Sequence, residues 1–99
     1  MEPDKDPVVR EIVGEAAKVE GIAWVVLFGS RGRGDHNRRS DYDIAISAPL
    51  LSRQDWTFFA SHLRDTVRTL CCLDLVRWED PLDPELRREI ERGIRVYAA

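Results

Sequence analysis

The sequence predicts a single domain covering residues 1–99 that combines helices and strands, α/β in the broad sense and α+β in the narrower one. In it, a mixed sheet of about four strands packs against about three helices. Three observations lead to this class. The chain has 99 residues, which allows one hydrophobic core. Three segments carry apolar residues at helical spacing, and four short runs rich in β-branched and aromatic residues alternate with them. The order along the chain is α-β-β-α-β-α-β, without an internal repeat.

The first helix and strand have recognisable ends. Asp6-Pro7 is typical of a helix N-cap followed by proline at the first helical position. Apolar residues then recur at helical spacing, at Val9, Ile12, Val13, Ala16 and Val19. We expect Gly21 to cap the C-terminus of this helix. Residues 23–28 (AWVVLF) are apolar throughout, which favours a strand buried on both faces.

The middle of the chain alternates between polar connections and regular structure. Residues 29–40 form an arginine-rich connection, with a short helical turn expected at its start, and residues 41–47 (DYDIAIS) form the second strand. Ser52 and Asp55 resemble a capping box at the start of the second long helix. The apolar stripe of that helix consists of Trp56, Phe59, Ala60, Leu63, Val67 and Leu70.

The last third of the chain predicts a strand, a short helix and a closing strand. Residues 71–78 (CCLDLVRW) form the third strand, and residues 94–97 form the last. Between them, Asp83-Pro84 marks the start of a third helix, with Leu86 and Ile90 facing inward and Gly93 closing it.

Composition excludes several classes of function. The net charge of −3 gives no general electrostatic attraction to duplex nucleic acid. The longest apolar run, residues 22–28, is far shorter than the roughly 20 residues that span a bilayer, so no membrane association is expected. Cys71 and Cys72 are adjacent and would point to opposite faces of a strand, so they cannot easily bridge each other, and we expect two plain small apolar residues in a reducing cytoplasm.

Asp41 and Asp43 are the first candidate site residues. Residues two apart in a strand point to the same face, so their carboxylates would lie side by side and repel. Divalent ions bridged by the pair would offset this repulsion, because hard cations such as Mg²⁺ take oxygen ligands and often share them with substrate phosphates. The alternative is that both aspartates cap a loop or lie in solvent.

Gly29-Ser30, directly after the first strand, is a candidate phosphate site. Glycine lets the backbone approach a phosphate, and the serine hydroxyl can donate a hydrogen bond. The alternative is an ordinary turn at a strand end. Four arginines follow, and they could neutralise a triphosphate or simply form a solvated basic loop: Arg31, Arg33, Arg38 and Arg39. Arg31, next to Ser30, is the first choice among them.

Asp74 is the third candidate carboxylate. It lies between apolar neighbours in the third strand, where an ionised carboxylate is costly unless it is paired or bound to metal. Beside the strand of Asp41 and Asp43, it could bind a metal ion and help to deprotonate an attacking hydroxyl. The alternative is a salt bridge, to Arg77 or to an arginine of the basic loop.

These residues together resemble a known family. Gly-Ser, ten residues, Asp-x-Asp and a later strand aspartate resemble the nucleotidyltransferase superfamily of DNA polymerase beta, and within it the minimal nucleotidyltransferases. The similarity runs through WVVLFGSR (residues 24–31), SDYDIAI (residues 40–46) and residues 73–97. The resemblance implies a small nucleotidyltransferase fold. It also implies that Gly29, Ser30 and Ser40 contact nucleotide phosphates, and that Asp41, Asp43 and Asp74 bind two Mg²⁺ ions.

The resemblance further implies a reaction and a partner. Members of this branch are typically encoded beside a helical HEPN-type toxin, and they resemble antitoxins that move AMP from ATP to a tyrosine hydroxyl of that partner. Two other functions stay open. One is an antitoxin that neutralises its partner by contact alone. The other is nucleotidyl transfer to a small molecule such as an aminoglycoside, although this sequence lacks the second acidic lobe that a cationic acceptor would favour.

Overall fold

The computed structural model describes residues 5–37, 39–67 and 69–99 of the chain. The elements are α1 (Pro7–Ala17), β1 (Trp24–Phe28), α2 (Gly29–Arg33), β2 (Tyr42–Ser47), α3 (Arg53–Thr66), β3 (Leu73–Arg77), α4 (Pro84–Glu91) and β4 (Ile94–Ala98). The predicted α/β class and the mixed four-stranded sheet are confirmed. The short helical turn expected after the first strand is α2. With it, the described residues form four helices rather than three.

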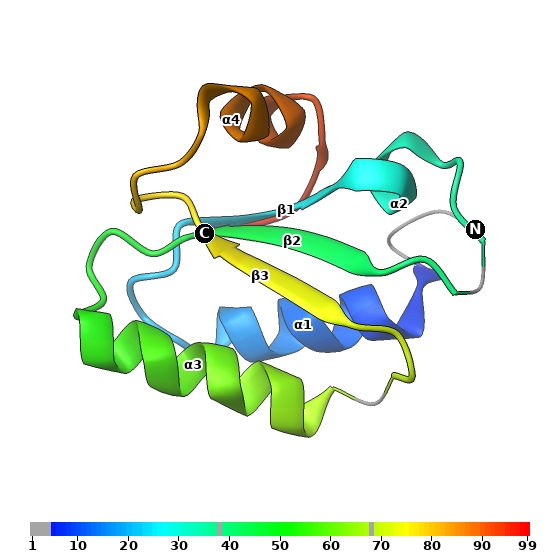
Figure 1. Ribbon diagram of the computed structural model, residues 1–99. Helices are drawn as coiled ribbons and strands as arrows, with labels where there is room; N and C mark the ends of the chain where they lie inside the picture. The colour runs from blue at the N-terminus through cyan, green and yellow to red at the C-terminus, as the bar shows by residue number, and fades with distance from the viewer. Residues whose placement is uncertain (1–4, 38, 68) are drawn as a thin grey trace.

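The sheet has the strand order β3-β2-β1-β4. β1 pairs antiparallel with both β2 and β4, whereas β2 and β3 are parallel. The parallel pair follows from the connection, because α3 carries the chain back before β3 begins. Figure 1 shows α1 and α3 on one face of the sheet, α4 on the other, and α2 at the end where β1 stops.

Side-chain alternation divides the core into two layers. On the α1/α3 face, β1 and β2 bury Val25, Leu27, Ile44 and Ile46 against apolar residues of the two helices. On the α4 face, a smaller cluster consists of Val26, Phe28, Ala45 and Ile90. Burial on both faces of β1 confirms the prediction for residues 23–28, and it follows from the central position of the strand.

The three predicted helix starts are confirmed. Asp6, Ser52 and Asp83 are N-caps whose side chains accept hydrogen bonds from backbone N–H groups of the first turn. Two helix ends were predicted wrongly. α1 ends at Ala17, and Gly21 (φ 99°) lies in the connection to β1 rather than at a cap.

The second error concerns the end of α3. Leu70 was expected on the apolar stripe, but the helix ends at Thr66 because Val67 adopts an extended conformation (φ −74°, ψ 121°). Leu70 is therefore fully exposed. No helix in the three described stretches is long and apolar enough to cross a membrane.

Candidate active site

The alternation of β2 brings the candidate carboxylates to the α4 face of the sheet. Tyr42 is packed with the α1/α3 core, so the next residue, Asp43, points to the opposite face. In register, Asp43 lies opposite Phe28 of β1 and opposite Asp74 of β3. The pairing thus places the β3 aspartate beside the β2 aspartate, as the sequence predicted.

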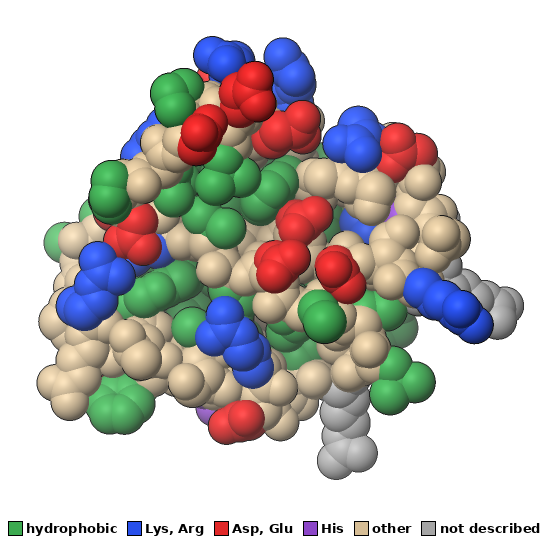
Figure 2. Space-filling view, viewed as in Figure 1, with side chains coloured by type: hydrophobic (Ala, Val, Ile, Leu, Met, Phe, Trp, Pro, Cys, Tyr) green, Lys and Arg blue, Asp and Glu red, His purple; other side chains and the backbone are tan. Residues whose placement is uncertain are grey.

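These carboxylates interact electrostatically. Partial burial raises the pKa of Asp43 above its ordinary value, and the charge of Asp74, a side-chain hydrogen bond with it and the charge of Asp41 raise this pKa further. Arg33 acts in the opposite direction. Figure 2 shows acidic side chains gathered near the middle of the face on this side of the sheet. The site therefore concentrates negative charge that a cation would stabilise.

Gly29 lies directly against Asp43. Its φ of +70° is in the left-handed region, which favours glycine. A Cβ atom at this position would lie 3.1 Å from Cγ of Asp43 and closer still to a carboxylate oxygen. The Gly-Ser turn at the start of α2 and the β2 aspartate are thus in contact, although 13 residues separate the glycine from Asp43 and the intervening loop is largely exposed.

Three other predicted site residues lie close in the chain to Gly29 or Asp43. Asp41 is exposed at the end of the loop before β2, and Ser30 is half-buried in α2. The carbonyl of Ser40 accepts a hydrogen bond from Nε of Arg31 (3.0 Å), and its hydroxyl accepts one from the N–H of Asn37 (3.0 Å). Ser40 therefore lies beside Asp41 in a loop that is held by hydrogen bonds.

Asp74 has surroundings different from those expected. The sequence suggested a carboxylate enclosed by apolar neighbours, but Asp74 is exposed because β3 is an edge strand of the sheet. The ion pair considered with Arg77 is also wrong, since Arg77 lies 3.6 Å from Glu79 at the other end of β3. Asp74 is therefore open to solvent on one side and adjacent to Asp43 on the other.

Arg31, the first choice among the arginines, points away from the carboxylates. Its side chain is buried among Asp6, Tyr42 and the loop carbonyls, so its guanidinium has no free surface to offer to a phosphate. Arg33 has the position that was expected of Arg31, because it is exposed and close enough to lower the pKa of Asp43. Helical spacing could have indicated this, since residues four apart in a helix share a face and Arg33 is four after Gly29. Arg39 is exposed, and Arg38 lies outside the described residues.

The described side chains offer few ligands to a divalent metal ion. Within the described stretches, no three His, Cys, Asp or Glu side chains converge in a metal-binding arrangement. Two carboxylates, those of Asp43 and Asp74, do lie together, and their negative charges repel each other. Mg²⁺ commonly binds through one or two carboxylates, with phosphate and water oxygens completing its shell. The residues present therefore fit a hard cation that binds together with a nucleotide.

Comparisons with known proteins identify a matching family model and similar folds. The family model described as "Polymerase beta, Nucleotidyltransferase" matches residues 10–99. No curated protein matches the sequence. A toxin–antitoxin crystal structure with AMP-PNP has a TM-score of 0.67 at 20% identity, with 100% of this chain and 75% of that chain covered.

Two further structures are similar. A mutant of the MntA–HpeT toxin–antitoxin, in which two aspartates two positions apart are replaced by glutamate, has a TM-score of 0.66 at 19% identity and covers 100% of this chain and 75% of that chain. A Sulfolobus solfataricus protein, a candidate nucleotidyltransferase, has a TM-score of 0.60 at 21% identity, covering 92% and 78%. At these identities the likeness shows a common fold.

Proposed function

The chain belongs to the polymerase beta nucleotidyltransferase family, and from that premise we propose that it transfers a nucleoside monophosphate from ATP in a Mg²⁺-dependent reaction. The observation that carries this proposal is the contact between Gly29 and Asp43, with Asp74 next to Asp43 in the sheet. This contact supports the proposal because a backbone turn suited to phosphate and two carboxylates of the type that binds Mg²⁺ lie close together on the α4 face.

In this proposal one group of residues contacts the nucleotide phosphates, and a second group binds the metal ions. Gly29, Ser30 and Ser40 contact the phosphates, and the exposed Arg33 replaces the buried Arg31 as the cation that neutralises the leaving pyrophosphate. The three aspartates would hold two Mg²⁺ ions: Asp41, Asp43 and Asp74. When bound, the metal ions would lower the pKa of the attacking hydroxyl and stabilise charge on the leaving oxygen.

The covalent step is an in-line displacement at the α-phosphorus. The oxygen of an acceptor hydroxyl forms a bond to this phosphorus, while the bond to the oxygen that bridges the α- and β-phosphates breaks. Pyrophosphate leaves with the electron pair of the broken bond. Asp74 accepts the hydroxyl proton, for which its exposed position beside Asp43 is suited.

We further propose that the acceptor is a tyrosine hydroxyl of a HEPN-type toxin and that AMP transfer makes this chain an antitoxin. Exposure of Asp41 and Asp74 supports a protein acceptor, because a large partner can reach both carboxylates. The similar toxin–antitoxin structure with AMP-PNP, and the spacing of the two substituted aspartates in the second one, support the same proposal.

Label transfer tests the proposed function. Purified protein is incubated with α-³²P-labelled ATP, Mg²⁺ and the protein encoded beside it, in parallel with Asp41→Asn/Asp43→Asn. A control variant, Asp65→Asn, removes an exposed aspartate of α3, a helix on the opposite face of the sheet from α4 (Figure 1). Label on the partner with wild type and control, but not with the double variant, is the expected result. A stable complex without label would contradict catalysis and favour neutralisation by contact. Label on an aminoglycoside instead would favour a small-molecule acceptor.

A further inference from the structure

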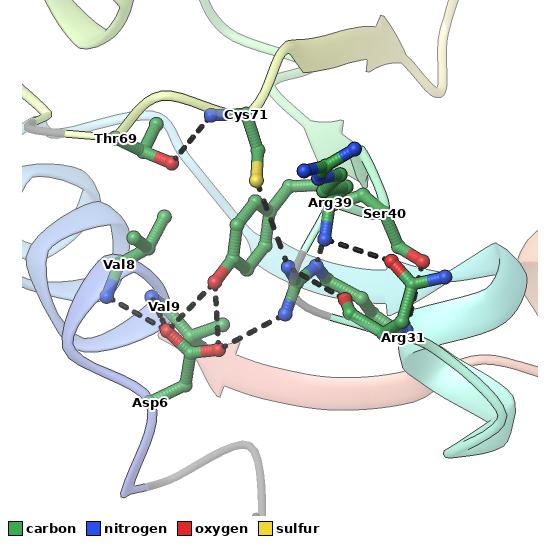
Figure 3. Close-up of polar contacts among 10 residues, drawn as sticks. Asp6, Val8, Val9, Arg31, Arg39, Ser40, Thr69 and Cys71 are labelled. Atoms are coloured by element: carbon green, nitrogen blue, oxygen red, sulfur yellow. Dashed lines mark hydrogen bonds and ion pairs between the residues drawn. The ribbon is translucent and has the colours of Figure 1, made fainter.

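Arg31 is a buried cation with partners in several segments. Its side chain is 7% exposed, and its guanidinium carbon lies 3.8 Å from the centre of the Tyr42 ring. Nε donates a hydrogen bond to the carbonyl of Ser40 (3.0 Å), and one terminal nitrogen donates a longer one to the carbonyl of Asn37 (3.4 Å). Figure 3 shows the guanidinium between the Ser40 segment and Asp6.

The other side of the guanidinium faces the start of α1 and the approach to β3. A terminal nitrogen lies 3.6 Å from a carboxylate oxygen of Asp6, the N-cap of α1. The same carboxylate accepts a hydrogen bond from the hydroxyl of Tyr42 (2.8 Å). The other terminal nitrogen, which donates to the carbonyl of Asn37, also contacts Sγ of Cys71 (3.8 Å). Burial of the charge is thus compensated by a carboxylate, two carbonyls and an aromatic face.

These partners belong to the segments that carry the candidate site residues. Arg31 itself follows Gly29-Ser30, and Ser40 directly precedes Asp41. Tyr42 lies between Asp41 and Asp43, and Cys71 is three residues before Asp74. One side chain therefore joins α2, the loop before β2, the start of β2 and the approach to β3, on the opposite side of the strand from the carboxylates.

We propose that Arg31 is the positioning residue of this site, an inference that rests on the proposed function. Its planar fork holds the Gly-Ser turn, the Asp41 loop and the approach to Asp74 in one arrangement without contacting nucleotide. Lysine cannot replace it, because a single ammonium cannot satisfy two carbonyls and a carboxylate while stacking on Tyr42. Loss of the fork therefore separates the Gly29-Ser30 turn from the carboxylates.

A matched control exists at the other end of the sheet. Arg77 is also buried (9% exposed), and it donates hydrogen bonds to the carbonyls of Ala48 and Leu51, both at 2.6 Å. Arg77→Lys therefore perturbs a loop anchored by a buried arginine, as Arg31→Lys does, but at the end of β2 away from Asp43. Comparison of the two variants separates positioning of the site from general stability.

The test has two readouts that do not depend on catalysis, both taken well below the unfolding transition. With Mn²⁺ as the probe, titration calorimetry should show at least a tenfold weaker Kd for Arg31→Lys and a change of less than twofold for Arg77→Lys. Amide hydrogen exchange at residues 39–43 should accelerate at least tenfold in Arg31→Lys alone. The N–H of Tyr42, bonded to the carbonyl of Cys72 (2.9 Å), is the central reporter.

A milder variant covers the case in which Arg31→Lys does not fold. Asp6→Asn keeps an N-cap side chain on α1 but removes the negative charge that faces Arg31, so smaller changes of the same sign are expected. Equal exchange at residues 39–43 in wild type and variants would overturn the inference, whatever the catalytic result. Failure of the proposed function alone would appear as wild-type protein that transfers no nucleotide but shows the exchange dependence on Arg31.

Discussion

Asp43 combines partial burial with two acidic neighbours, and this arrangement has an energetic consequence. Because the pKa of Asp43 is raised in the folded protein, the folded state binds its proton more tightly than the unfolded chain does. Stability of the metal-free protein must therefore fall as pH rises from the ordinary aspartate pKa through the raised one. Above that window, the ionised carboxylate destabilises the fold.

Asp43→Asn should accordingly stabilise the metal-free protein at pH 7, by roughly 0.2–1 kcal/mol, because it removes like charges from facing positions of neighbouring strands. Urea unfolding with EDTA measures the effect, with Asp65→Asn as the control for loss of one surface charge. The advantage should disappear at pH 3, where Asp43 of the wild type is protonated in both states. A loss of stability at pH 7 would contradict this account.

Tyr42 provides a second titration, at alkaline pH. Burial and the hydrogen bond to Asp6 raise the pKa of Tyr42 from 10.0 to about 12. The folded protein thus keeps this proton where the unfolded chain loses it, so stability should fall between pH 10 and 12. Tyr42→Phe should lack this fall, and should lose about 1–3 kcal/mol at pH 8, because Asp6 loses a donor. Unfolding curves at pH 8–11.5 test both statements, and an identical alkaline limb in the variant would refute the assignment.

In the proposed site, Arg33 is the cation that contacts the nucleotide phosphates, and it contributes little to the fold. Its ion pairs with Asp35 (3.1 Å) and Glu89 (3.6 Å) are exposed, and such pairs are worth up to about 1 kcal/mol. Arg33→Ala should raise KM for ATP about tenfold, which corresponds to ~1.4 kcal/mol of lost binding. Arg53→Ala is the matched control, because it breaks an exposed pair with Asp80 (3.1 Å) away from the site. Equal KM values in the two variants would remove Arg33 from the phosphate site.

At the scale of elements, the junction of β1 and α2 places the Gly29-Ser30 turn against β2. The positive φ of Gly29 turns the chain directly from strand to helix, and the absence of a side chain leaves room for Asp43. Gly34, at the C-terminal end of α2, also has a positive φ (+83°), but a Cβ there would meet no atom within 4 Å. The two glycines bound the same helix with different steric demands.

This difference predicts separate outcomes for two alanine substitutions. Gly34→Ala should cost about 1–2 kcal/mol, the strain of a left-handed residue. Gly29→Ala should cost clearly more and abolish transfer, because its methyl group displaces the Asp43 carboxylate. Denaturation midpoints and label transfer measure these effects. Gly29→Ala that loses no more stability than Gly34→Ala, and remains active, would show that the contact with Asp43 is unimportant.

Local signals in the sequence predicted the elements well. The N-caps Asp6, Ser52 and Asp83 were correct because capping depends on a few neighbouring residues, which the sequence shows directly. The misplaced ends at Gly21 and Leu70 depend on where the chain must turn back onto the sheet, and composition does not encode that point. The surroundings of Arg31 were equally hidden, because its partners come from segments up to 40 residues away.

At the scale of the whole molecule, the lateral order of strands determines how accessible the site is. The sequence predicted four strands and their order along the chain, but not the order β3-β2-β1-β4 across the sheet. That order makes β3 an edge strand, which exposes Asp74 while register keeps it beside Asp43. Long-range pairing thus produced both the correct grouping of the carboxylates and the unexpected exposure of one of them.

The same arrangement couples the site to the stability of the whole domain. Mg²⁺ with a non-hydrolysable ATP analogue would bind only the folded protein and not the unfolded chain, because the unfolded chain does not bring the α2 turn, β2 and β3 together. At about 100 times Kd, the ligand adds ~2.7 kcal/mol, and 1 kcal/mol shifts Tm by roughly 4–8 °C in a domain of this size. Wild-type protein should therefore melt at least about 10 °C higher with both ligands than with EDTA. Asp43→Asn should melt higher than wild type in EDTA but gain little from the ligands. A shift of equal size in this variant would show that the nucleotide and metal bind away from the carboxylates of β2 and β3.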